Sequence, residues 1–276
     1  MISCLILTLN EEQNLPRCLE SLWWCDDITV FDSFSSDRTV EIARAAGARV
    51  VQRKFDNWAA HQTWGAKNIN YKYPWVYYSD ADEVITRELK EELLSVAGIP
   101  NNPLAAYRLR FKNFFMGRWI KHSSLYPSWI VRFYRPEKIR WERVVNPVPV
   151  VDGPEGRLKS HFEHYSFNKG LNAWFDKHNR YSRQEAEESL KSLATGSLKL
   201  GDLWNREPAA RRRALKELSF RLPCRPLLRF LYMYFARLGF MDGVPGYHYC
   251  RMLAIYEYMI VLKMKEARRR ERGLPI

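Results

Sequence analysis

A strand-like apolar segment followed by a polar turn and a helical pattern recurs through the first third of the chain, and this repeat constrains the fold most. The apolar segments are residues 2–7, 28–31, 48–52 and 75–78. Repeated strand and helix units imply a mostly parallel sheet, because the chain must cross over to return to the next parallel strand. We therefore predict an α/β fold with helices on both faces of a central sheet.

Polar residues follow three of these strands at the point where each strand ends. Residues 8–11 follow the first strand, Asp32 follows the second, and residues 80–82 follow the fourth. Ligands of open α/β sheets bind beyond the carboxyl ends of the strands, so these three groups are expected to meet in one crevice. Tight turns also favour Asn, Asp and Ser, which is the alternative explanation for each group alone.

The fourth strand delivers two carboxylates in the sequence Asp80-Ala81-Asp82. Residues two apart in a strand project to the same side, so Asp80 and Asp82 can converge on one hard cation, while Ala81 is small enough for a ligand to approach. Such a cation needs an anionic partner, typically a diphosphate. The alternative is a solvated turn that caps a helix beginning near Thr86.

The charge of the chain is unevenly distributed. Of the net charge of +13, residues 206–276 carry +10, from 16 Lys and Arg against 6 Asp and Glu. The five cysteines are scattered and form no C-x-x-C pair, which favours a reducing cytoplasm. The N-terminal residues lack a basic leader and are expected to form the first strand.

The last quarter of the chain alternates apolar and aromatic residues with Lys and Arg, and no stretch reaches the length of a membrane span. This pattern is typical of helices that lie in a membrane interface, so we predict a domain over 1–200 and a basic amphipathic helical region over 201–276, peripheral on the inner face of the cell membrane. The alternative is packing on the first domain or on a second subunit, as in a homo-oligomer. No nucleic-acid-binding motif accompanies the charge.

Three motifs resemble the family 2 glycosyltransferases, which have the GT-A fold. They are Leu5-Ile6-Leu7-Thr8-Leu9-Asn10-Glu11-Glu12, the Asp32-Ser33-Phe34-Ser35-Ser36-Asp37-Arg38-Thr39 turn, which is similar to the family's D-S-x-S-x-D-x-T, and Ser79-Asp80-Ala81-Asp82-Glu83. Further likeness at Gln62-x-Trp64-Gly65-Ala66 and His164-Tyr165-Ser166 is to the bacterial branch of lipopolysaccharide-core and exopolysaccharide glucosyltransferases. The resemblance covers residues 1–185 well.

The resemblance implies a nucleotide-sugar site and a Mn²⁺ or Mg²⁺ site. The implied nucleotide-sugar-binding residues are Thr8, Leu9, Asn10, Glu11, Asp32, Asp37, Gln62, Asp80 and Ala81. The implied metal ligands are Asp82, Asp80 and His164. For His164 the alternative is a hydrogen-bonded core residue, since a lone histidine is commonly of that kind.

An inverting transfer also needs a general base near the acceptor hydroxyl. Many relatives carry Val-His-Glu where this chain has Val145-Asn146-Pro147, and neither Asn146 nor Pro147 can take a proton. Glu142 is the closest substitute in sequence, with Asp152 and Glu163 behind it, and we assign Glu142 as catalytic together with Asp82. The alternative for Glu142 is an ion pair with Arg140 or Arg143.

These observations predict an inverting, metal-dependent glycosyltransferase that moves a sugar from a nucleotide-sugar, preferably a UDP-sugar, to a lipid-linked or lipopolysaccharide or exopolysaccharide precursor. The missing His-Glu leaves open a catalytically silent nucleotide-sugar-binding subunit of a membrane glycan assembly. A nucleotidyltransferase is disfavoured, because residues 8–11 are not a Gly-rich, basic phosphate loop.

Overall fold

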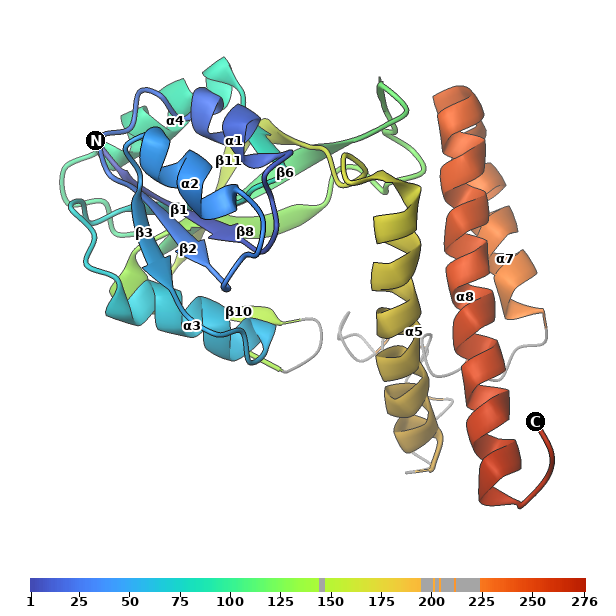
Figure 1. The fold of residues 1–276 in the computed structure, drawn as a ribbon. Coiled ribbons are helices and arrows are strands. Elements are labelled where there is room, and N and C mark those ends of the chain that lie inside the picture. Colours follow the sequence, from blue (N-terminus) through green and yellow to red (C-terminus); the bar gives the residue numbers. More distant parts are fainter. Residues whose placement is uncertain (144–146, 195–200, 202–203, 205–210, 212–223) are drawn as a thin grey trace. The chain divides into compact units, whose positions relative to one another are not determined.

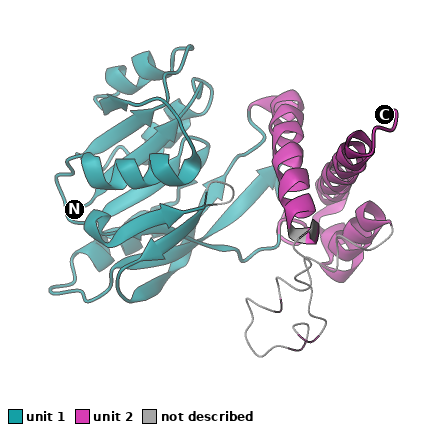
Figure 2. Cartoon of the chain, turned by 90° about the horizontal axis from the view of Figure 1, so that it is seen from below, with its two compact units in different colours: residues 1–119, 125–168 teal, residues 120–124, 169–276 magenta. Residues whose placement is uncertain are grey.

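A computed structural model describes residues 1–143, 147–194, 201, 204, 211 and 224–276. The chain forms two compact units, which are coloured separately in Figure 2. Unit 1 contains residues 1–119 and 125–168, and unit 2 contains residues 120–124 and 169–276. The sequence predicts a boundary between residues 200 and 201. Residue 200 lies outside the described residues, so this boundary stays a prediction.

Unit 1 is built on one large sheet with the strand order β3-β2-β1-β4-β8-β6-β11-β5, and β7 pairs with β6. Its strands are β1 (Ser3–Thr8), β2 (Ile28–Asp32), β3 (Arg49–Gln52), β4 (Val76–Asp80), β5 (Glu83–Ile85), β6 (Ala106–Phe115), β7 (Arg118–Trp119), β8 (Trp129–Tyr134) and β11 (Glu155–His164). Strands β1 to β4 are mutually parallel, and β8 runs antiparallel to both β4 and β6. The predicted α/β fold with a mostly parallel sheet is confirmed.

Helices cover both faces of the sheet (Figure 1). On one face, apolar residues of β1 pack with α1 (Leu15–Ser21), α2 (Thr39–Ala45) and α4 (Arg87–Ala97). On the other face, Leu5, Phe31 and Tyr78 pack with α3 (Trp58–Asn68) and with the hairpin of β9 (Ile139–Glu142) and β10 (Val148–Val151), which follows the short η1 turn (Pro136–Lys138). The alternation of side chains along the strands supplies both cores.

Two side chains fix the starts of the helices that flank the fourth strand. The Asn57 side chain accepts a hydrogen bond from the Ala60 amide at the start of α3, and Thr86 does the same for the Leu89 amide at the start of α4. Helix α3 lies close to the sheet because it carries Gly65: a Cβ there would stand 3.1 Å from the Phe31 ring. The position of α3 in turn sets the position of Gln62, described below.

Unit 2 is helical. It contains α5 (Gly170–Ala194), α7 (Arg225–Leu231), the π-helical turn η3 (Tyr232–Ala236), η4 (Gly239–Asp242) and α8 (Gly243–Glu271). Helices α5 and α8 share a small core of Ala186, Ile260 and Met264, and Arg225 at the start of α7 pairs with Glu257 of α8 at 2.8 Å. Among the helices that the structure describes, none combines the length and apolar character needed to cross a bilayer.

Residues 120–124 belong to unit 2 although they follow β7 and precede β8 in the chain. Buried Asp242 holds them: its carboxylate accepts the amide N–H of His122 at 2.9 Å, the amide N–H of Ser123 at 2.7 Å and the Ser123 hydroxyl at 2.7 Å. Three donors on one buried carboxylate satisfy its charge and fix this loop on the helices.

Candidate active site

The carboxyl ends of β1, β2 and β4 lie side by side, as the sequence predicted. Thr8 pairs with Asp32 across the first two strands, and Leu7 pairs with Asp80 across β1 and β4. The polar residues after these strands therefore share one edge of the sheet.

Asp32 is fully buried and joins three segments at this edge. Its carboxylate accepts hydrogen bonds from the Thr8 hydroxyl at 2.9 Å, from the Ser35 amide at 2.9 Å and from the Gln52 side chain at 2.9 Å, and the Ser35 hydroxyl also donates to it. The predicted nucleoside-binding carboxylate thus holds the ends of β1, β2 and β3 together. Nothing in the sequence pattern singled out Gln52.

The loops after β1 and β2 are tied to each other by the other predicted binding residues. Oδ1 of Asn10 accepts the Ser36 amide at 2.8 Å, and the Glu11 amide donates to the Thr39 hydroxyl at 2.7 Å. The Asp37 carboxylate accepts the Glu12 amide at 3.1 Å. Leu9 is half exposed between them. The two loops form one surface at the carboxyl edge of the sheet.

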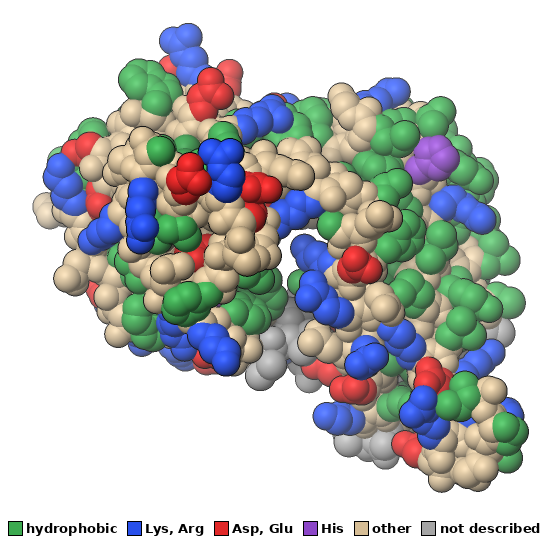
Figure 3. Space-filling view, in the orientation of Figure 1, with side chains coloured by type: hydrophobic (Ala, Val, Ile, Leu, Met, Phe, Trp, Pro, Cys, Tyr) green, Lys and Arg blue, Asp and Glu red, His purple; other side chains and the backbone are tan. Residues whose placement is uncertain are grey.

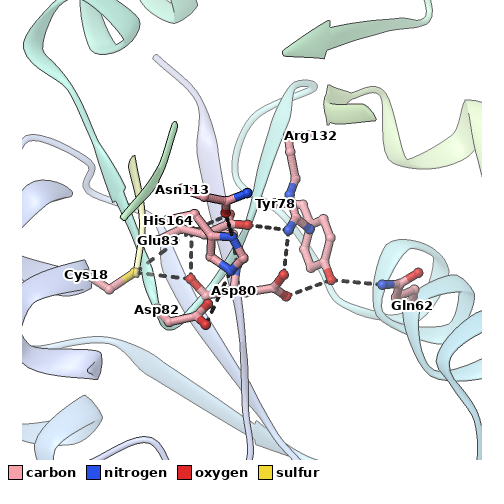
Figure 4. Close-up of polar contacts among 10 residues, drawn as sticks. Cys18, Gln62, Tyr78, Asp80, Asp82, Glu83, Asn113, Arg132 and His164 are labelled. Carbon is pink, nitrogen blue, oxygen red and sulfur yellow. Dashed lines mark hydrogen bonds and ion pairs between the residues drawn. The ribbon is translucent and has the colours of Figure 1, made fainter. Parts of the chain in front are cut away.

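A chain of polar contacts runs from α3 to β8 across the end of β4 (Figure 4). The Gln62 amide donates to the Tyr78 hydroxyl at 2.9 Å, and that hydroxyl donates to Asp80 at 3.0 Å. The other oxygen of Asp80 accepts from Arg132 Nη2 at 2.5 Å. The Arg132 guanidinium stacks on the Tyr78 ring, 4.2 Å from its centroid. Asp80 is therefore held from both sides, and Ala81 behind it is buried.

Arg132 also pairs with the buried carboxylate of Glu83. One guanidinium charge faces two carboxylates, so one negative charge is left over in buried surroundings. Burial raises the pKa of Glu83 to about 8 against the lowering effect of Arg132. The structure therefore favours a protonated Glu83 beside Asp80.

Asp82 lies beside His164 at the end of β11, where Nε2 of His164 is 3.4 Å from Oδ2 of Asp82. On the other side of the ring, Nδ1 of His164 lies 2.7 Å from Oδ1 of Asn113 on β6. An amide oxygen can only accept, so Nδ1 carries the proton and Nε2 presents its lone pair toward Asp82 when the ring is neutral. Burial acts to lower the pKa of His164, but the charge of Asp82 and its hydrogen bond with the ring outweigh burial, so the pKa is raised from its ordinary value.

These residues fit a divalent cation that is shared with a diphosphate. A histidine whose second nitrogen is held by an acceptor is the usual arrangement of a metal-binding imidazole. Within the residues that the structure describes, no three His, Cys, Asp or Glu side chains gather closely enough to hold a metal alone. Mg²⁺ commonly takes one or two protein ligands and completes its shell with water and substrate phosphates. Of the predicted ligands, Asp82 and His164 lie together, and Asp80 is engaged by Arg132 and Tyr78.

Glu142 lies on β9, half exposed, and pairs with Arg140 at 3.1 Å. With Arg143 it lines a groove of about 580 Å³ against α3, where Thr63, Trp64 and Lys67 form the facing wall. The neighbouring Trp141 packs toward the Tyr78 ring, at 6.3 Å between centroids. Val145 and Asn146 of the altered motif lie outside the described residues. The assignment of Glu142 as base stays a prediction.

Sequence reasoning missed Arg132 and Asn113. Each becomes a site residue only through the order of strands, since β8 lies next to β4 and β11 lies next to β6. The one available signal was an arginine in the otherwise apolar strand Trp-Ile-Val-Arg-Phe-Tyr, because buried cations require carboxylate partners.

Comparison with known proteins decides the family. The family model described as glycosyl transferase family 2 matches residues 3–154, which is more than half of the chain. The chain belongs to glycosyltransferase family 2. The match contains β1, β2 and β4 with all of their polar ends.

Two glycosyltransferases resemble almost the whole chain at low identity. An uncharacterized glycosyltransferase, RT0209 of Rickettsia typhi, is 23% identical over 286 residues and aligns with 99% of this chain and 89% of its own length. The lipopolysaccharide core biosynthesis glycosyltransferase LpsC of Rhizobium meliloti is 23% identical over 274 residues, covering 95% of this chain and 91% of its own.

Among solved structures, a mannosyltransferase, PcManGT from Pyrobaculum calidifontis, in complex with GDP-Man and Mn²⁺, is similar with a TM-score of 0.52 and 12% identity. The alignment covers 95% of this chain and 86% of that one. At this identity the likeness shows the fold, and it agrees with the predicted GT-A architecture.

Proposed function

We propose that this family 2 glycosyltransferase transfers a sugar from a nucleotide-sugar, with inversion, to a lipid-linked or lipopolysaccharide or exopolysaccharide precursor, and that it uses Mn²⁺ or Mg²⁺. The observation that carries the proposal is the pair of Asp82 and His164, placed beside Asp80 at the carboxyl end of β4. The presence of GDP-Man and Mn²⁺ in the structural neighbour supports it.

Asp82 and His164 would hold the cation, with Asp80 next to them on the diphosphate side. When bound, a divalent cation neutralises the charge that develops on the departing diphosphate. Arg132 orients the Asp80 carboxylate through one of its oxygens, and Tyr78 fixes the other. The protein's contribution is this preset geometry, which costs no reorganisation during the reaction.

The donor would lie along the joined loops after β1 and β2 and reach the end of α3. In the part of the chain that the structure describes, Oε1 of Gln62 is buried and has no hydrogen-bond donor, while its amide nitrogen is used by Tyr78. A buried oxygen without a partner is costly unless a ligand supplies one. A hydroxyl of the donor would do so.

Inversion requires that an acceptor hydroxyl attack the face of the sugar opposite the diphosphate while a base removes its proton. We keep Glu142 as that base. Its carboxylate is half exposed and held by one surface arginine, so an acceptor in the groove beside it could displace that arginine.

The acceptor class and membrane location rest on the LpsC likeness and on the basic helices of unit 2. The name of LpsC refers to lipopolysaccharide core biosynthesis. We therefore propose a peripheral enzyme on the cytoplasmic face of the membrane, with the helical region as its contact.

A thermal-shift screen of UDP-, GDP- and TDP-sugars with Mn²⁺ tests the donor assignment, because a specific ligand raises the unfolding temperature by mass action. We expect one donor to stabilise the protein in a Mn²⁺-dependent way and to be hydrolysed slowly. Asp82→Asn should abolish both the Mn²⁺ dependence and the hydrolysis. Full metal-dependent hydrolysis by this variant would overturn the site assignment.

The second candidate is a donor-binding subunit without turnover, which the change from His-Glu to Asn146-Pro147 favours. Donor stabilisation without hydrolysis or transfer, across the same nucleotide-sugars and a set of lipid-linked acceptors, would support this candidate instead.

A further inference from the structure

An exposed apolar surface covers α7, η3, η4 and the first turns of α8. Ten large apolar side chains in this segment are each 40–65% exposed, and we call them the apolar face: Leu227, Leu228, Leu231, Tyr232, Phe235, Leu238, Phe240, Met241, Val244 and Tyr247. Figure 3 shows hydrophobic side chains gathered on the right of the view, over α8 and α7. Contiguous exposed apolar surface of this kind marks a binding surface.

The apolar face is separate from the packing surface of the same helices. Helix α8 packs on α5 through Ile260 and Met264, and Glu257 of α8 pairs with Arg225 of α7. The residues of the apolar face remain exposed although these contacts are made. Burial inside unit 2 therefore does not explain them.

The charges around the apolar face are positive. Arg237 and Arg251, both exposed, lie within or just after this segment, and neither has a carboxylate partner in the described part of the chain. The single acidic residue between 224 and 256 is Asp242, which is buried and bonded to residues 122 and 123. The surface thus offers apolar side chains and unpaired cations together.

We propose that the apolar face inserts into the headgroup region of an anionic lipid leaflet, with these arginines at the phosphates. Helices with this composition lie in the plane of the interface with the apolar side chains below the headgroups. A second copy of the chain fits less well, because face-to-face pairing would bring two sets of unpaired arginines together. This inference deepens the proposed function, on which it rests for the lipid-linked acceptor.

The apolar face restricts the membrane contact to one segment of unit 2. The sequence pattern assigned membrane contact to the whole basic region, including the run from Lys263 to Arg270. In the structure ten of the fifteen exposed large apolar side chains of residues 224–276 lie between 227 and 247, and Ile255, Tyr258 and Leu262 follow along α8. The Lys263 to Arg270 run lies at the other end of α8 from the apolar face. Insertion should therefore depend on η3 and its neighbours rather than on the C-terminal run.

Flotation of the full-length protein with vesicles tests the inference. We expect binding to phosphatidylcholine vesicles that contain phosphatidylglycerol, weaker binding to phosphatidylcholine alone, and a partial loss in salt, since charges beyond about 8 Å are screened at physiological ionic strength. The double variant Phe235→Glu, Val244→Glu should lower the partition coefficient at least about ten-fold. The control is Ile99→Glu, a change at an apolar residue of unit 1 that is 48% exposed, and this variant should bind like the wild type.

A second variant covers the case in which the first fails to fold. Arg237→Gln with Arg251→Gln leaves the apolar residues in place and should reduce binding to anionic vesicles while binding to neutral vesicles is unchanged. Circular dichroism and donor thermal shift should match the wild type for both variants.

Three outcomes would overturn the inference: no flotation of the wild type, equal flotation of the folded Glu variant, or a wild-type dimer in sedimentation that the Glu variant dissociates. The last would assign the face to a second copy. Donor stabilisation is measured without lipid, so a failure of the proposed function appears in that measurement and not in flotation.

Discussion

Asn113 on β6 holds the ring of His164 on β11, with 2.7 Å between Oδ1 of the amide and Nδ1 of the imidazole. The two residues are register neighbours on parallel strands. This contact turns Nε2 toward Asp82 and sets the tautomer that a cation requires.

Replacing Asn113 by Ala should weaken Mn²⁺ binding by about 10–100-fold, because the imidazole loses the partner that orients it. His164→Ala should weaken it at least as much. The measurement is a Mn²⁺ titration by calorimetry with the stabilising nucleotide present, and Asn70→Ala on the surface is the control. If Asn113→Ala and His164→Ala both bound Mn²⁺ as tightly as the wild type, the assignment of His164 as a metal ligand would be wrong.

Arg132→Met should destabilise unit 1 by about 3–5 kcal/mol, because Asp80 loses its buried counter-charge and the buried Glu83 carboxyl loses its hydrogen-bond donor. Urea unfolding measures the loss. The added change Glu83→Gln should alter this loss little, since Glu83 favours its protonated form and the amide replaces one neutral group by another. If the urea midpoint of Arg132→Met equalled that of the wild type, the Arg132 guanidinium would not be stabilising these two carboxyl groups.

His61 should make the protein less stable in acid. Burial and the charge of Arg53 lower the pKa of His61 from 6.5 to about 4, so the folded state favours the neutral ring. The unfolded chain then binds more protons between pH 6.5 and 4, and stability falls as the pH drops through this window, by on the order of 2 kcal/mol. Carboxylates titrate in the same window, so the test compares urea unfolding of the wild type and His61→Gln from pH 7 to pH 4. If the free energy of unfolding fell equally with pH in the wild type and in His61→Gln, His61 would not contribute to the acid sensitivity.

Gly246→Ala should disturb unit 2, because an added Cβ would clash with the Gly239 carbonyl and stand 2.6 Å from Cβ of Asp242. Overpacking at such a contact costs about 1–3 kcal/mol. Faster hydrogen exchange at the amides of His122 and Ser123, both bonded to Asp242, would report it. Gly201→Ala, where a Cβ meets no atom, is the control and should leave exchange unchanged.

The sequence predicted the parts of the fold and site that depend on local pattern. The carboxyl ends of parallel strands share one edge of a sheet, so the pattern of apolar strands and polar turns is enough to place Thr8, Asp32 and Asp80 together. The structure has these three residues at that edge. The partners of these residues depend on sheet order. Because β8 lies between β4 and β6, Arg132 reaches Asp80, and no pattern along the chain encodes that neighbour.

The role of each carboxylate also depends on context. The alternation of a strand places Asp80 and Asp82 on one side, but β4 ends at Asp80 and the chain turns before β5 begins at Glu83. The two carboxylates therefore meet different partners, Arg132 for Asp80 and His164 for Asp82. The motif Asp80-Ala81-Asp82 alone does not reveal the exact residue at which the strand ends.

The hydrogen bonds between Asp242 and residues 122 and 123 limit how this chain can be combined with a relative in a chimera. A stretch that folds with the helices is encoded between two strands of the sheet unit, so neither unit can be exchanged for a relative's by a single crossover. A chimera joined after residue 168 would present the 120–124 loop of one parent to the helices of the other. We expect such hybrids to express well only when the 120–124 loop and the helices come from the same parent.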